Sequence, residues 1–298
     1  MKTVSVVIPT YKNRGGLISS VNSVLEQDYD NLIEILVVDD NEPTSEYRET
    51  TSQLMQQYAD NRLVRYICHE TNKNGAAARN TGIRASQGDY IAFLDDDDMF
   101  LPHKLKKQVS YLEEHPEKDA VYCFAKRAGR VVSSSAIEGN GIREILLQKS
   151  NYFTPSLMFR REVLEHINGF DETFQRHQDY DLMLRFFATG YEIGCIPEVL
   201  IEIGLNQGEN IPSGEKINQL KKYFFQKFGS YIEKEDLITP GFKNQVFARH
   251  YASVFLNHLK HKNFRMAIDV FFHHFMKSPK SFMMVIFNSV IIHLKGEA

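Results

Sequence analysis

Hydrophobic and polar positions along the first 125 residues follow two alternating patterns. Short apolar runs of strand length lie at residues 4–8, 33–38, 63–67, 90–94 and 120–124. Between these runs, apolar residues recur at helical spacing after the glycine pair 15–16, after a cap at Thr44 or Ser45, at residues 76–85, and from Pro102 onward. Strands that alternate with helices predict an α/β fold, with a mainly parallel sheet flanked by helices.

The pattern loosens after residue 130. Short helices are predicted at residues 143–149 and 161–167, a longer helix at 180–189, and a strand at 191–196. A polar, glycine-containing connection follows at 204–214, and from about residue 216 the pattern is helical. We therefore expect one α/β domain over residues 1–205 and a C-terminal helical region over residues 206–298.

The C-terminal region ends in a segment rich in Phe, Met and Ile, at residues 264–294. Basic side chains flank it at Arg265, Lys277, Lys280 and Lys295. Such a segment can lie in a lipid interface as a peripheral membrane contact. It can equally pack on the rest of the chain or form a homodimer, and the pattern leaves these alternatives open.

Composition excludes several classes of protein. The chain has 298 residues, 43% hydrophobic and 24% charged, and a net charge of -3, so no nucleic-acid partner is expected. Its three cysteines are far apart, which fits neither a disulfide framework nor a zinc site. No apolar run reaches the roughly 18 residues of a membrane span, and none at the N-terminus resembles a signal peptide. We expect a cytoplasmic protein, with peripheral association on the inner face of the plasma membrane as the alternative.

Histidines of the C-terminal region do not indicate a metal site. They lie among helical residues without convergent ligand spacing, and we interpret them as scattered surface or core residues: His258, His261, His273 and His274.

Four carboxylates, Asp95 to Asp98, follow directly after the apolar run that ends at Leu94. Neighbouring carboxylates raise one another's pKa, so such a cluster needs compensation. A divalent cation supplies it, and carboxylate oxygens suit Mg²⁺ or Mn²⁺, which commonly share phosphate oxygens with a substrate. The alternative is a solvated acidic loop. Open α/β sheets bind ligands at the carboxyl ends of their strands, which favours a site.

Further chemistry converges on the same edge of the predicted sheet, from residues 9–11, 39–40, 74–80 and 95–98. Tyr11 offers a ring for stacking a flat base, and Asp40 offers an acceptor for a base N–H. The helix that begins near Gly75, together with Arg79, can bind a diphosphate. Singly, Tyr11 and Asp40 can be ordinary turn residues and Arg79 can pair with a structural carboxylate. Their convergence indicates a nucleotide site, and no P-loop, G-x-G-x-x-G, H-E-x-x-H or G-x-S-x-G motif competes with it.

These stretches together resemble the family 2 glycosyltransferases. The resemblance rests on Val6-Val7-Ile8-Pro9-Thr10-Tyr11, Val37-Val38-Asp39-Asp40, Ala77-Ala78-Arg79-Asn80-Thr81-Gly82-Ile83 and Phe93-Leu94-Asp95-Asp96-Asp97-Asp98. It continues in Gly169-Phe170-Asp171-Glu172, Asp179-Tyr180-Asp181-Leu182-Met183-Leu184-Arg185, Gly190-Tyr191 and Pro197-Glu198, and covers roughly residues 3–205. The family implies a GT-A fold, which is a Rossmann-like sheet, a nucleotide-diphosphate sugar donor, a divalent metal and inversion at the anomeric carbon.

The resemblance also implies roles for single residues. Asp95 and Asp97 match the metal-binding D-x-D motif, and Asp179 matches the catalytic base. The nucleobase contacts are Pro9, Tyr11 and Asp40, with Asp39 as the alternative to Asp40. The other donor-binding residues are Arg79, near the diphosphate, and Asp95 and Asp96 of the D-x-D motif. An aspartate at position 179 would also be favoured simply by a helix N-terminus.

Two positions depart from the family pattern. The Glu that usually precedes the base is Gln178 here, which alters hydrogen bonding on the acceptor side. An Arg-x-His found in many relatives aligns with Gly204 and Asn206. Either this loop aligns differently or the metal is bound more weakly.

The resemblance implies an inverting, metal-dependent glycosyltransferase. It would move a sugar from a nucleotide-diphosphate donor, expected to be UDP-linked, to a glycan or lipid-linked glycan acceptor in cell-surface polysaccharide synthesis. A sugar-phosphate nucleotidyltransferase is one alternative. It would leave Asp179 without a role, and it needs a glycine-rich basic loop after the first strand, which residues 12–16 resemble only weakly. A non-catalytic nucleotide-sugar-binding protein is another: Gln178 and Asn206 keep it open, while the intact aspartates count against it.

Overall fold

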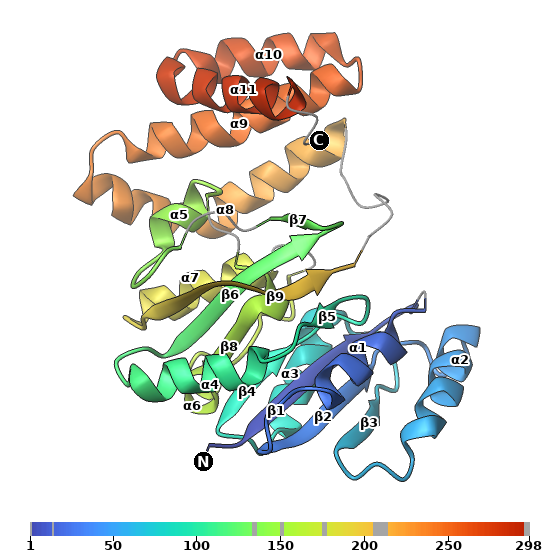
Figure 1. The fold of residues 1–298 in the computed structure, drawn as a ribbon. Coiled ribbons are helices and arrows are strands. Elements are labelled where there is room, and N and C mark those ends of the chain that lie inside the picture. The colour runs from blue at the N-terminus through green and yellow to red at the C-terminus, as the bar shows by residue number, and fades with distance from the viewer. Residues whose placement is uncertain are drawn as a thin grey trace. The chain divides into compact units, whose positions relative to one another are not determined.

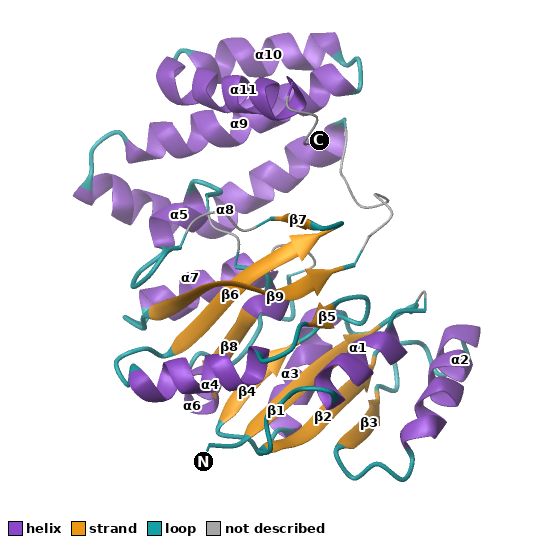
Figure 2. Ribbon diagram, in the orientation of Figure 1, coloured by secondary structure: helices purple, strands orange, loops and turns teal. Residues whose placement is uncertain are grey.

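The structure is a computed structural model that describes residues 2–13, 15–132, 136–149, 152–174, 178–204 and 214–294, with side chains described up to residue 287. Contacts between residues divide the chain into two compact units, shown in Figures 1 and 2. The first comprises Met1–Gly141 and Asn151–Leu205, and the second comprises Ile142–Ser150 and Asn206–Ala298. The short segment 142–150 thus groups with the C-terminal helices.

The first half of the sheet in unit 1 is parallel, with the strand order β3-β2-β1-β4. Its strands are β1 (Val4–Thr10), β2 (Leu32–Asp39), β3 (Val64–Cys68) and β4 (Tyr90–Phe93). The helices of this half are α1 (Leu17–Leu25), α2 (Glu46–Met55), the 3₁₀ turn η1 (Gln56–Tyr58) and α3 (Gly75–Ala85). Nearly every residue of β1, β2 and β4 is buried, as expected for strands with helices on both faces.

Helices α1 and α3 cover opposite faces of β1. Leu17 of α1 belongs to the same apolar core as Val6 and Ile8. Gly82 of α3 instead lies against Val7, so closely that a Cβ at position 82 would be 2.2 Å from Val7 Cγ1. Since successive residues of a strand point to opposite faces, the two helices sandwich the strand.

The second half of the sheet adds β8, β6, β9 and β5 after β4, with β7 paired to β6. The strands are β5 (Met99–Phe100), β6 (Ala120–Arg127), β7 (Arg130–Val131), β8 (Leu157–Arg160) and β9 (Ile193–Ile203). Its helices are α4 (Lys104–Glu114), the 3₁₀ turn η2 (Thr154–Ser156), α6 (Arg161–His166) and α7 (Gln178–Ala188). The β6–β9 ladder is long and parallel, whereas the antiparallel ladders are short. The predicted α/β fold with a mainly parallel sheet is confirmed.

The sequence pattern misplaced the start of one helix, ended the strand predicted at residues 191–196 seven residues before the end of β9, and missed three strands. Helix α4 begins at Lys104, not at Pro102, because His103 adopts a left-handed conformation with φ 70° before the first helical residue. The missed strands are β5, β7 and β8, which have two, two and four residues. Runs this short carry no periodic signal.

Unit 2 is helical, as the pattern predicted. It contains α5 (Ile142–Leu146), α8 (Glu215–Ile238), α9 (Phe242–Lys260), α10 (Phe264–Phe275) and α11 (Pro279–Leu294). Helices α10 and α11 both pack on α9, where Phe282 is fully buried against Ala248 and Ala252. Within the described residues, no helix has the length and apolar character needed to cross a membrane.

Candidate active site

The carboxyl ends of three parallel strands bring distant segments to one edge of the sheet. Thr10, at the end of β1, pairs with Asp39 at the end of β2, and its carbonyl accepts a hydrogen bond from the Asp40 N–H at 2.9 Å. The Thr10 hydroxyl donates to Asp96 Oδ2 at 2.6 Å. Next to this junction, Pro9 is half-buried and the side chain of Tyr11 is 46% exposed. The segments 9–11, 39–40 and 95–98 therefore meet as predicted.

Asp39 is enclosed by the protein. Its carboxylate accepts hydrogen bonds from the Asn41 N–H and Asn41 Nδ2, both at 2.8 Å, and from the Tyr66 hydroxyl. Arg48 Nε lies 3.1 Å from its other oxygen. Burial, with Asp39 as hydrogen-bond acceptor, raises the pKa of Tyr66 above its usual range. Asp39 thus shapes the turn after β2 and does not face solvent.

Asp40 is also buried, and its carboxylate organises the loop that precedes α3. One oxygen contacts His69 Nδ1 at 2.7 Å and the Lys73 N–H at 2.8 Å, and the other accepts from Asn72 Nδ2 and the Asn74 N–H, both at 2.8 Å. These contacts use the roughly four acceptor positions of a carboxylate. In this structure Asp40 holds the loop and leaves no free acceptor, so its direct contact with a base stays a prediction. His69 was missed by the sequence analysis because it lies in no recognised motif.

The N-terminus of α3 is capped by its own chain. Asn74 has φ 92°, and its side-chain oxygen accepts hydrogen bonds from the N–H groups of Ala76 at 2.9 Å and Ala77 at 3.2 Å. Two of the backbone donors expected to face a diphosphate are therefore already engaged. The cation expected there, Arg79, follows one turn later.

Arg79 joins the acidic strand end to helix α7. Its Nη2 lies 2.5 Å from Asp95 Oδ1, and its Nη1 donates to Gln178 Oε1 at 3.1 Å. The guanidinium is 12% exposed and lies 5.5 Å from the centre of the Phe170 ring, while Asp95 is 37% exposed. Gln178 is fixed in turn by donating Nε2 to the Phe174 carbonyl at 2.7 Å. The expected cation, one motif aspartate and the acceptor-side glutamine are thus in direct contact.

The remaining aspartates of the run differ in environment. Asp96 accepts from Thr10 and from Asn13 Nδ2 at 3.0 Å, and desolvation raises its pKa to about 6. Asp98 is buried and accepts the Gly204 N–H at 2.8 Å, and burial, followed by repulsion from Asp95, raises its pKa to about 8. Asp96 and Asp98 therefore hold the loop together.

Asp97 is half-buried, and no hydrogen bond ties its carboxylate to another residue of the described chain. Desolvation and the charge of Asp95 raise its pKa, while Arg127, at the end of β6, acts in the opposite direction. Arg127 is exposed and was not singled out from the sequence. The mutual repulsion of Asp95 and Asp97 is the kind of instability that a cation relieves.

These carboxylates fit a metal shared with a ligand better than a metal held by protein alone. Asp95 and Asp97 supply hard oxygen donors, which suit Mg²⁺ or Mn²⁺. In the described part of the chain, no group of three or more His, Cys, Asp or Glu side chains can hold a metal ion. Magnesium commonly takes one or two carboxylates and completes its coordination with substrate phosphates and water. The donor set therefore fits a cation that binds together with a diphosphate.

Asp179 lies in the first turn of α7, next to Gln178. Burial raises the pKa of Asp179 to about 6. The negative charge of Asp95 also raises it, while the positive charge of Arg79 lowers it. A carboxylate with this pKa is mostly ionised at neutral pH and is a stronger base than an ordinary aspartate. Its catalytic role stays a prediction.

Two other aspartates near Asp179 have structural partners. Asp171 accepts hydrogen bonds from the N–H and hydroxyl of Thr173, at 2.9 and 2.6 Å. Asp181 is buried and accepts from Arg185 Nε at 2.8 Å. Neither is as well suited as Asp179 to accept a proton from a substrate.

Gly204 explains one departure from the family pattern. A Cβ at this position would lie 2.2 Å from the carbonyl oxygen of Asp97, so an arginine cannot replace it in this backbone geometry. Asn206, the other departing position, lies outside the described residues.

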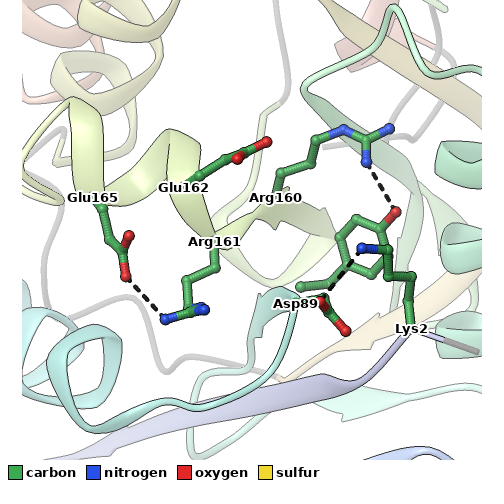
Figure 3. A pocket seen from close by; sticks show the side chains of 7 residues that line it. Lys2, Asp89, Arg160, Arg161, Glu162 and Glu165 are labelled. Atoms are coloured by element: carbon green, nitrogen blue, oxygen red, sulfur yellow. Dashed lines mark hydrogen bonds and ion pairs between the residues drawn. The ribbon is translucent and has the colours of Figure 1, made fainter.

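A small charged cavity lies elsewhere in unit 1, beside Asp89 and the first residue of β4, Tyr90, at the amino end of that strand (Figure 3). Its volume is about 120 Å³. Four of the charges that line it form two pairs, Lys2 with Asp89 at 3.4 Å and Arg161 with Glu165 at 3.2 Å, and Arg160 donates to the Tyr90 hydroxyl at 3.1 Å. We therefore assign it no part in the candidate site at the opposite end of β4.

Comparison of the sequence with known proteins identifies its relatives. The sequence model described as glycosyl transferase family 2 matches residues 5–176. An uncharacterised glycosyltransferase of Methanocaldococcus jannaschii is 30% identical over 234 residues, which cover 75% of this chain and 78% of the relative. The amylovoran biosynthesis glycosyltransferase AmsB of Erwinia amylovora is 30% identical over 66% of this chain and 67% of its own length.

Solved structures share the fold. S. aureus TarS 1-349 in complex with UDP-GlcNAc superposes with a TM-score of 0.60 at 19% identity, over 90% of this chain and 89% of its own. The mannosyltransferase PcManGT from Pyrobaculum calidifontis, in complex with GDP-Man and Mn²⁺, superposes with a TM-score of 0.55 at 19% identity. The match covers 85% of this chain and 64% of PcManGT. The chain therefore belongs to glycosyl transferase family 2 and has the GT-A fold.

Proposed function

We propose that this glycosyltransferase is an inverting, metal-dependent enzyme that uses a UDP-linked sugar and transfers it to a hydroxyl of a glycan or lipid-linked glycan in cell-surface polysaccharide synthesis. The observation that carries the proposal is the contact of Arg79 with both Asp95 and Gln178. It joins the carboxylates suited to a metal-bound diphosphate to the helix turn that bears Asp179. Donor and acceptor chemistry thus occur at one edge of the sheet.

TarS supports a UDP-linked donor, PcManGT supports the metal but holds a GDP-linked sugar, and AmsB supports the pathway. TarS is crystallised with UDP-GlcNAc and PcManGT with GDP-Man and Mn²⁺, and AmsB takes its name from amylovoran biosynthesis. Tyr11 is exposed beside the strand ends, as a ring that stacks on a base must be. Asp40 contributes by fixing residues 72–74, which lead into α3.

The proposed reaction is a direct displacement. The Asp179 carboxylate takes the proton of the acceptor hydroxyl, whose oxygen forms a bond to the anomeric carbon as the bond from that carbon to the diphosphate breaks. The electron pair of the broken bond leaves on UDP, and attack from the opposite side inverts the anomeric centre. When bound at Asp95 and Asp97, the metal would neutralise charge on the departing diphosphate. Arg79 holds Asp95 in place and adds a further positive charge.

The experiment that tests the proposal needs no acceptor. Purified protein is incubated with Mn²⁺ and a panel of UDP- and GDP-sugars, and slow hydrolysis of the donor is followed. We expect release of UDP from one or a few UDP-sugars and no release when the metal is chelated. Hydrolysis of GDP-sugars alone would overturn the assignment of UDP, and equal rates with chelator would overturn metal dependence.

The same assay tests the non-catalytic alternative. A protein that only binds nucleotide-sugar would show a calorimetric signal with UDP-sugars but no turnover with any donor. The position of Asp179 beside Gln178 and within electrostatic range of Arg79 favours turnover.

A further inference from the structure

Helices α10 and α11 expose apolar side chains that a helix in water normally covers. Phe272 is 68% exposed and Phe287 is 65% exposed. Among the side chains that the structure describes, up to residue 287, the exposed large apolar residues on these two helices and the turn between them are Phe264, Met266, Ile268, Phe272, Met276, Met283, Met284 and Phe287. We call these eight residues the apolar surface of unit 2. Exposed apolar patches on a protein surface mark binding sites.

The members of this surface follow helical geometry. Phe264, Ile268 and Phe272 recur every four residues along α10, so they form one stripe beside the face that packs on α9. On α11, Phe282 is buried against α9, whereas Met283, Met284 and Phe287 point away from that contact. The pattern is that of amphipathic helices whose second apolar face lacks a partner in the described chain.

The charges around the surface favour one partner. Between residues 264 and 287 the chain has three cations, Arg265, Lys277 and Lys280, and one carboxylate, Asp269. Asp269 is itself paired with His273, 3.2 Å away. No ion pair involves Arg265 or Lys280 within the described residues. Lys277 is exposed, with its Nζ 5.9 Å from the centre of the Phe247 ring. A surface that combines exposed Phe and Met with an excess of cations over carboxylates complements an anionic lipid headgroup layer over an apolar interior.

A second copy of the chain is a poorer partner. In a symmetric dimer the same surface meets itself, so the cations of one copy would approach those of the other. Only Asp269 could offset them. The helices are also unsuited to crossing a bilayer: α11 has 16 residues, which at 1.5 Å per residue is about 24 Å, shorter than a hydrocarbon core of about 30 Å. The surface is therefore suited to lying on a membrane.

We infer that the apolar surface of unit 2 docks this glycosyltransferase on anionic lipid bilayers, with Phe272, Phe287 and their neighbours entering the interface and Lys277 and Lys280 contacting headgroups. This inference does not rest on the proposed donor, metal or acceptor. Failure of vesicle binding would leave the proposed reaction untouched, and failure of donor hydrolysis would leave the membrane inference untouched.

Sedimentation of the full chain with vesicles tests the inference. Phosphatidylcholine vesicles are compared with vesicles that also contain phosphatidylglycerol, at low and high salt. We expect sedimentation with the anionic vesicles, weaker binding to the neutral ones, and a decrease as salt rises. The double variant Phe272→Glu/Phe287→Glu should lose about tenfold or more in vesicle affinity, and Lys277→Gln/Lys280→Gln about tenfold on anionic vesicles only.

The matched control is Leu237→Glu/Ile238→Glu, at the end of α8. These side chains are 85% and 66% exposed but lie outside the apolar surface, so their replacement should leave vesicle binding unchanged. Circular dichroism checks that each variant is folded. If the Phe272→Glu/Phe287→Glu variant does not fold, the Lys277→Gln/Lys280→Gln variant still tests the inference. A wild-type chain that stays in the supernatant with both vesicle types would overturn the inference. So would a control variant that loses binding as strongly, or a salt-insensitive dimer that the Phe variant dissociates.

Discussion

Asp179 is the residue on which the proposed chemistry most depends. Replacing it by Asn removes the proton acceptor but keeps the size of the side chain. We expect the transfer rate of Asp179→Asn to fall by about 10²- to 10⁴-fold, the usual contribution of a general base. UDP affinity, measured by calorimetry, should stay within error. The matched control is Asp171→Asn, whose carboxylate caps a turn at Thr173. If the Asp171 variant loses transfer and the Asp179 variant does not, the base is Asp171.

The pKa of Asp179 gives the same assignment a second test. Burial raises this pKa to about 6, and the residue acts as a base only when it is deprotonated. The transfer rate should therefore rise about tenfold per pH unit below pH 6 and level off above it. The donor-binding enthalpy should not follow this profile. A pH profile that begins to level off near pH 4 would mean that the base is an aspartate exposed to solvent.

Asp97 should govern the effect of the metal on donor binding. Its carboxylate has no hydrogen-bonding partner among the other described residues, and its pKa is raised by desolvation and by Asp95. We expect UDP to bind at least about tenfold more tightly to the wild-type chain with Mn²⁺ than with chelator, because the cation bridges carboxylates and diphosphate. Asp97→Ala should show the same weak affinity in both conditions. Calorimetry that gives equal wild-type affinities with and without metal would contradict this.

At the scale of single elements, the packing of α3 on β1 depends on a glycine. A Cβ at Gly82 would lie 2.2 Å from Val7 Cγ1, so Gly82→Ala must push the helix from the strand. We expect a loss of about 1–3 kcal/mol in the free energy of unfolding, the usual cost of overpacking. The matched control is Gly229→Ala in α8, where a Cβ meets nothing within 4 Å. This substitution should raise the free energy of unfolding by about 0.5–1 kcal/mol, because alanine is favoured over glycine inside a helix. Denaturant unfolding of both variants measures the contrast. Equal effects would mean that α3 can shift at no cost.

The strand ends around β1 show how far the sequence predicts the site. The apolar runs and the acidic run after β4 were sufficient to predict that residues 9–11, 39–40 and 95–98 meet. The contact of Arg79 with Gln178 was not predictable, because the two residues are 99 positions apart and only the tertiary fold joins them. The engagement of Asp40 with residues 72–74 depends likewise on loop geometry, which has no periodic signal.

The two-residue strand β5 and the close approach of Gly204 were also not predictable from the sequence. β5 pairs Met99 and Phe100 with β9, and this pairing brings the end of β9 against Asp97 and Asp98. Neither β5 nor the close approach of Gly204 leaves a pattern in the local sequence, because both are set by partners about 100 residues away. Long buried strands are predictable from their composition, while the loops that complete the site are not.

At the scale of the whole molecule, each unit has apolar clusters of its own among the described residues. The core of unit 1 comprises residues of β1, β2, β4, α1 and α4, and the clusters of unit 2 comprise residues of α8 to α11. Donor and metal would bind only unit 1, since every candidate site residue lies there. A ligand that binds the folded form alone stabilises it by RT ln(1 + [L]/Kd), about 2.7 kcal/mol at a hundredfold excess over Kd.

We therefore expect thermal unfolding to show two transitions, of which UDP with Mn²⁺ raises only one. Phe282→Ala should lower only the other, because Phe282 is fully buried among α9 and α11 and its truncation costs about 3–5 kcal/mol. The matched control is Phe287→Ala, on the same helix but exposed, which should change neither transition. Scanning calorimetry of the wild-type chain and both variants, each with and without UDP and Mn²⁺, measures these transitions. If Phe282→Ala lowers the ligand-stabilised transition by the same amount as the other, the two units unfold as one cooperative body.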